Sequence, residues 1–182
     1  MTKEEIIDII ADLYEEHKIS KLGFSLKQYC NEAGILLIPY SSFGSKRKNL
    51  IEFDEDGFNI INSESNCCEI YYNDEIFPKL RMNFTVPHEI GHISLGHNLK
   101  LGSETLKQNR EANIFANEFY CPQVLIIYFN LLTKSKLMST FNITSGYAET
   151  LLTKILQRRS LRFTPSEQRL LNIFLNNQKN KK

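Results

Sequence analysis

Three of the four histidines of this chain lie within ten residues of one another, in the sequence VPHEIGHISLGH at residues 86–97. His88 and His92 are four positions apart, and in an α-helix this separation places two side chains on the same face, about 6 Å apart along the axis. Pro87 is typical of the first turn of a helix, where its missing N–H costs no hydrogen bond. The sequence therefore predicts a helix that begins near residue 86 and presents two imidazoles side by side.

The pattern His88-Glu89-Ile90-Gly91-His92 is an H-E-x-x-H sequence, in which both imidazoles can reach one zinc ion at about 2.0–2.1 Å. Zinc lowers the pKa of a bound water toward neutrality, and Glu89 is the predicted general base for its attack on a peptide carbonyl. Gly91 is expected to let the backbone come close to the metal. Nitrogen-rich ligation favours zinc over manganese, so we expect one zinc ion per chain and a third protein ligand.

The segments around this motif predict an α+β protein. Residues 4–18 repeat apolar side chains at helical spacing, and Ser25 suits the N-cap of a second, short helix that ends near Gly34. Four β-rich segments predict a small antiparallel sheet of three to four strands: Ile35–Pro39, Leu50–Phe53, Phe58–Ile61 and Cys68–Tyr72. This sheet should pack on the H-E-x-x-H helix and on a second ligand helix at Asn109–Tyr120. An all-helical C-terminal part should follow, with helices at Val124–Leu132, around Lys136–Phe141, at Ser145–Arg158 and at Thr164–Phe174.

Composition and charge narrow the class of protein. The chain is 42% hydrophobic and 24% charged with a formal net charge of +1, which is typical of globular proteins and gives no overall attraction to nucleic acid or to a membrane. The acidic N-terminus lacks the basic start of a secretory signal, and the longest apolar run, Val124–Phe129, is too short to cross a bilayer. No C-x-x-C spacing occurs, so the four cysteines are expected to be reduced thiols in a cytoplasmic protein.

Two motifs in order point to a known family. The stretch NFTVPHEIGHISLGH, followed by REANIFANEFYCP, resembles the ImmA/IrrE metallopeptidases, in which an H-E-x-G-H helix precedes a second helix of the form E-A-N-x-F-A and then a proline. The resemblance covers about residues 25–125. It implies a zincin-like metallopeptidase core at residues 1–125 and a helical extension, packed on that core, at residues 126–182.

The same resemblance implies a gluzincin-like site whose third metal ligand is an acid on the second helix. Glu111 is the predicted ligand, and Asn113 is a candidate for orienting one of the histidines. Relatives often carry another acid at the position of Asn109, and that acid is an alternative third ligand. If it is the ligand, the asparagine in this chain leaves the metal site weakened. Glu118 is a further alternative, although a surface role suits it better. His97 lies five residues after His92, where metzincins need six, and is interpreted as a helix C-terminal residue.

The C-terminal segment resembles a helix-turn-helix around residues 136–158. We expect it to pack on the core in preference to binding DNA, although Lys154, Arg158, Arg159 and Arg162 could contact phosphates. The predicted function is a zinc endopeptidase that cleaves a protein partner, which by resemblance is a helix-turn-helix repressor encoded beside it in a mobile element. The alternative is a non-catalytic interaction or DNA-binding module with a degenerate metal site. The sequence leaves the oligomeric state open.

Overall fold

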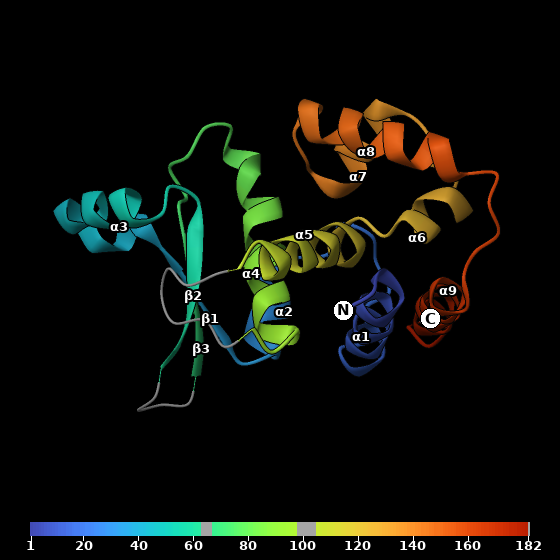
Figure 1. The fold of residues 1–182 in the computed structure, drawn as a ribbon, viewed down its shortest axis with the longest axis horizontal. Coiled ribbons are helices and arrows are strands. Elements are labelled where there is room, and N and C mark those ends of the chain that lie inside the picture. The colour runs from blue at the N-terminus through green and yellow to red at the C-terminus, as the bar shows by residue number, and fades with distance from the viewer. Residues whose placement is uncertain (63–66, 98–104, 182) are drawn as a thin grey trace. The chain divides into compact units, whose positions relative to one another are not determined.

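The computed structural model describes residues 1–62, 67–97 and 105–181, and the chain divides into two compact units. Residues 25–116 form one unit, which contains the sheet, and residues 1–24 with 117–182 form the other, which is helical. The predicted α+β class with an all-helical C-terminal part is confirmed (Figure 1). The predicted division into residues 1–125 and 126–182 stays a prediction.

The sheet of residues 25–116 has three strands in the order β1-β3-β2: β1 Ile35–Pro39, β2 Gly57–Asn62 and β3 Cys67–Tyr72. β3 pairs antiparallel with β2, so that Gly57 lies opposite Tyr72, and parallel with β1, so that Ile35 lies opposite Cys68. The sheet is therefore mixed, whereas the sequence suggested antiparallel pairing throughout. The reason is topological, because β3 returns from β2 and inserts beside β1, which runs opposite to β2.

One predicted strand is a helix. Leu50–Phe53 belongs to α3, Arg47–Phe53, which follows the 3-10 helix η1, Tyr40–Lys46. Leu50 and Phe53 are three residues apart and so lie on one face of a helical turn, a spacing that a short apolar run does not distinguish from a strand. The ring of Phe53 packs edge-on against Phe58 of β2, with centroids 5.0 Å apart, which explains why this short helix is held beside the sheet.

Helices α2, Leu26–Glu32, α4, Met82–Ser94, and α5, Leu106–Tyr120, complete this unit, α5 continuing into the other. Ser25 caps α2 as predicted, since its side chain accepts a hydrogen bond from the N–H of Gln28 at 3.2 Å. α4 begins earlier than predicted, after the 3-10 helix η2 at Lys79–Arg81, so Pro87 lies inside it. A proline there removes one backbone hydrogen bond, which the burial of this helix in the core offsets.

The helical unit contains α1 Lys3–Glu16, α6 Gln123–Tyr128, α7 Lys134–Phe141, α8 Ser145–Arg158 and α9 Pro165–Lys179. α1 and α9 lie side by side, and the rings of Tyr14 and Phe174 meet between them with centroids 6.2 Å apart (Figure 1). α9 starts at the predicted cap, where the side chain of Thr164 accepts a hydrogen bond from the N–H of Glu167. The helix-turn-helix-like pair α7 and α8 is present, and its binding to DNA stays a prediction.

No helix in the described parts of the chain combines the length and apolar character needed to span a bilayer. The four cysteines are free, and Cys30 and Cys121 are buried. Burial raises the pKa of the Cys30 thiol to about 12, so that thiol stays protonated and packs as a small apolar side chain.

Gly23 allows a close approach within the helical unit. Its φ is 60°, and a Cβ atom there would lie 2.0 Å from the carbonyl oxygen of Thr140. We expect Gly23→Ala to lower the free energy of unfolding by about 3 kcal/mol or more, because the backbone must move and the alanine would be strained. Urea denaturation followed by circular dichroism measures this change.

Gly146→Ala is the matched control. Gly146 lies in the first turn of α8, and a Cβ atom there would meet nothing within 4 Å, so alanine should be neutral or stabilise by up to about 1 kcal/mol. Equal stability of the two variants would show that the contact at Gly23 is not needed for folding.

Candidate active site

Helix α4 turns three sets of side chains toward three different surroundings. One set faces strand β2, one is fully buried in the core, and one contains the two motif histidines. Each set is a pair of residues four positions apart, as the helical repeat requires: Thr85 and Glu89 face β2, Val86 and Ile90 are buried, and His88 and His92 form the third pair.

The structure brings His88 and His92 together. Their Nε2 atoms lie 3.1 Å apart, and their rings meet at 68° with centroids 4.8 Å apart. Two nitrogen ligands of a tetrahedral zinc ion lie about 3.4 Å apart when each bond is about 2.0–2.1 Å long. The pair therefore fits the spacing of two ligands on one metal ion.

Both imidazoles are uncharged at neutral pH. Burial lowers the pKa of His88, and burial together with the neighbouring His88 and His97 lowers the pKa of His92 to about 3. Neutral imidazole is the form that binds a metal ion, so burial keeps both rings in the ligating form.

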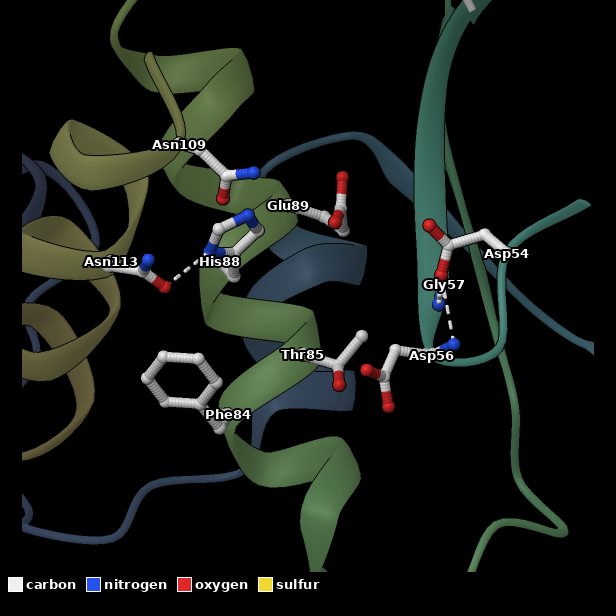
Figure 2. Close-up of a pocket in the computed structure, with 9 residues that line it drawn as sticks. All are labelled: Asp54, Asp56, Gly57, Phe84, Thr85, His88, Glu89, Asn109 and Asn113. Carbon is white, nitrogen blue, oxygen red and sulfur yellow. Dashed lines mark hydrogen bonds between the residues drawn. The ribbon is translucent and has the colours of Figure 1, made fainter. Parts of the chain in front are cut away.

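Asn113 contacts His88. Its Oδ1 lies 3.1 Å from His88 Nδ1, and the two side chains point toward each other in Figure 2. A carbonyl oxygen only accepts hydrogen bonds, so His88 must carry its proton on Nδ1. The Nε2 of His88 then presents a lone pair toward His92.

Glu89 is buried, with 4% of its surface exposed, and its Oε2 accepts a hydrogen bond of 2.6 Å from Asn59 Nδ2. Asn59 lies on β2, where side chains alternate between the two faces, and both Gly57 and Asn59 face α4. Sequence reasoning missed Asn59. The only available signal was a polar residue within an apolar strand, which needs a hydrogen-bond partner when it faces inward.

His88 and Glu89 line a pocket of about 260 Å³ (Figure 2). Across the pocket, Asp54 Oδ1 accepts hydrogen bonds of 2.9 Å from the N–H groups of Asp56 and Gly57, which fixes the loop before β2. The lining therefore combines residues of α4, the start of β2 with the loop before it, and two amides of α5: Asp54, Asp56, Gly57, Phe84, Thr85, His88, Glu89, Asn109 and Asn113.

α5 presents different residues on two of its faces. Asn109 and Asn113, one turn apart, line the pocket, whereas Glu111 has its Oε2 3.1 Å from His97 Nε2. Within residues 1–62, 67–97 and 105–181, no group of three or more His, Cys, Asp or Glu side chains is arranged to hold a metal ion. Glu111 as the third ligand stays a prediction.

Glu118, the further alternative, is not a surface residue as expected. Only 2% of it is exposed, and its carboxylate lies 2.7 Å from Lys3 Nζ and accepts a hydrogen bond from the N–H of Gln123. These contacts belong to the helical unit, where Glu118 joins the end of α5 to α1 and to the start of α6.

His97 follows the end of α4, as predicted, and makes a contact that sequence reasoning missed. Gly96 has a φ of 66°, and the N–H of His97 donates to the carbonyl of His92 at 3.0 Å, which is the Schellman arrangement. The same turn places His97 Nδ1 3.0 Å from His92 Nδ1. The sequence did contain a signal for this contact, because a glycine directly after the last helical turn predicts that the chain reverses there.

Gly91 lies against α5, and its expected place beside a metal stays a prediction. A Cβ atom there would lie 3.1 Å from both Cβ and Cδ1 of Phe115, a fully buried residue of α5. The glycine therefore allows the close packing of α4 on α5.

The model of peptidase family M78, described as the IrrE N-terminal-like domain, matches residues 30–150, about two thirds of the chain. The chain belongs to the M78 peptidase family. The resemblance to ImmA/IrrE proteins is confirmed, and M78 membership supports a metallopeptidase-type function. No curated protein and no solved structure matched the chain.

M78 peptidases are typically zinc-dependent, so the distances and protonation of the motif histidines can be compared with those of zinc ligands. The paired Nε2 atoms of His88 and His92 fit two zinc ligands in distance and in protonation. Asn109 lines the same pocket as His88 and offers an amide, a weaker zinc ligand than a carboxylate.

Proposed function

We propose that this M78 peptidase is a zinc-dependent endopeptidase, with His88 and His92 as metal ligands and Glu89 as the general base. The observation that most supports this proposal is the 3.1 Å approach of the Nε2 atoms of His88 and His92, because His88 lines the same pocket as Glu89. When bound, zinc would supply a Lewis acid that polarises the peptide carbonyl and acidifies a water.

The chain's own residues would orient the reactants and move the proton. Glu89 would accept a proton from the attacking water on its carboxylate and later give it to the leaving nitrogen. Asn59 holds Oε2 of that carboxylate, so Glu89 cannot rotate freely. Asn113 holds His88 with Nε2 unprotonated, and the buried surroundings limit competing water.

The proposed substrate is a protein in the cytoplasm, namely a helix-turn-helix repressor that cleavage would inactivate. This part of the proposal rests on the family resemblance. The site is compatible with it, because an open pocket bordered by a strand can admit an extended chain.

A second function is a non-catalytic module that binds protein or DNA. The lining of the pocket by Asn109 favours it, because α5 there presents an amide where a carboxylate would complete a strong zinc site. The arrangement of α7 and α8 would then be the binding element.

Metal content separates the two functions. We expect the purified protein to take up one zinc ion per chain, as measured by elemental analysis after dialysis. Cleavage of purified helix-turn-helix repressors, followed by gel electrophoresis and mass spectrometry, should stop with a chelator and return with zinc. A protein that takes up no zinc and cleaves nothing would favour the module.

A further inference from the structure

A chain of contacts extends from the motif histidines to Glu111. His92 Nδ1 lies 3.0 Å from His97 Nδ1, and His97 Nε2 lies 3.1 Å from Glu111 Oε2. All three side chains are buried, with 0%, 9% and 7% of their surfaces exposed. Nothing in the H-E-x-x-H chemistry itself uses His97 or its contact with Glu111.

We infer that His97 and Glu111 are positioning residues that hold His92 in the orientation and tautomer needed to bind a metal. The inference rests on the proposed function, in which His92 binds zinc through Nε2. It gives Glu111 a role through His97, in place of the direct ligand role predicted from the sequence.

The protonation pattern supports this assignment. If Nε2 of His92 offers its lone pair, the ring proton is on Nδ1 and must be donated to Nδ1 of His97. His97 then accepts at Nδ1 and carries its own proton on Nε2, which it donates to Glu111. A carboxylate only accepts hydrogen bonds, so Glu111 stabilises the tautomer of His97 that this arrangement requires.

The local backbone explains why His97 reaches His92. The left-handed Gly96 reverses the chain so that the N–H of His97 bonds the carbonyl of His92. The backbone and the side chain of His97 therefore both contact the same residue.

A double-mutant cycle on zinc affinity tests the inference. Affinities are measured by competition with a chromophoric chelator for the wild type, Glu111→Gln, His97→Phe and the double variant. We expect a loss of about 10-fold for Glu111→Gln and 10- to 100-fold for His97→Phe, with no further loss in the double variant. His97→Gln should recover part of the affinity, because an amide carries both an acceptor and a donor.

Tyr147→Phe is the matched control for a lost buried contact. Its hydroxyl donates to Asn117 Oδ1 at 2.8 Å in the helical unit, and the variant should keep the wild-type zinc affinity. A loss of about 1000-fold for Glu111→Gln that persists when His97 is Phe would make Glu111 a direct ligand and overturn the inference. Unchanged affinity in His97→Phe would overturn it as well.

A second measurement separates this inference from the proposed function. In metal-free protein labelled with ¹⁵N, nuclear magnetic resonance should show scalar coupling between Nδ1 of His92 and Nδ1 of His97 across their hydrogen bond. If the protein shows this coupling but binds no zinc, the contact between His92 and His97 is confirmed and the proposed zinc-dependent function is wrong. Absence of the coupling in the wild type would overturn the positioning pair whatever the zinc affinity.

Discussion

Glu89→Gln is expected to lower the rate of repressor cleavage by about 1000-fold, while zinc content stays at the wild-type level. The substitution keeps the size of the side chain and an oxygen that can accept from Asn59, but it removes the group that takes the proton. Gel densitometry at equal zinc loading measures the rate of cleavage. Elemental analysis measures the zinc content.

The matched control for this variant is Glu52→Gln. Glu52 is an exposed residue of α3 in the same unit, and its replacement makes the same change of charge. We expect wild-type cleavage and wild-type zinc content. Full cleavage by Glu89→Gln would remove Glu89 from the role of general base and leave the metal assignment standing.

His88→Ala and His92→Ala are each expected to lower zinc affinity by at least about 1000-fold. Each removes one of two imidazoles whose Nε2 atoms lie 3.1 Å apart, and a single remaining imidazole cannot hold the ion tightly. Asn113→Ala should cost only about 10- to 100-fold, because Asn113 acts through the orientation of His88. Competition with a chromophoric chelator measures all three.

His17→Ala is the control, since His17 lies at the C-terminal end of α1 in the helical unit. It should keep wild-type affinity. Thermal melts of the metal-free proteins separate loss of a ligand from loss of folding, which matters most for the fully buried His92. Undiminished zinc binding by both histidine variants would place the metal elsewhere in the protein.

Local signals in the sequence predicted much of the helical structure. Ser25 and Thr164 cap the helices they were expected to cap, and the H-E-x-x-H spacing placed both imidazoles on one helical face. These predictions hold because caps and helical repeats depend on neighbours within one turn. Pro87 shows where such local signals fail. It was expected in the first turn of α4, but the buried helix starts earlier and includes it.

Long-range contacts were less predictable. β3 pairs with β1 along one edge and with β2 along the other, and the local spacing of apolar residues does not reveal this choice of neighbours. Asn59 and Glu89 are thirty positions apart, so their hydrogen bond could not be read from spacing. Glu111 was predicted from its motif, but the rotation of α5 about its axis decides that Asn109 faces the pocket and Glu111 faces His97.

The three sets of side chains on α4 have a consequence for how a protein of this kind can change over time. Nearly every position from Thr85 to His92 is committed to the sheet, the interior or the histidine pair, so neutral drift has little room there. On α5, in contrast, exchange of the pocket-lining Asn109 for an acid would strengthen the metal ligands of the site without altering that crowded helix.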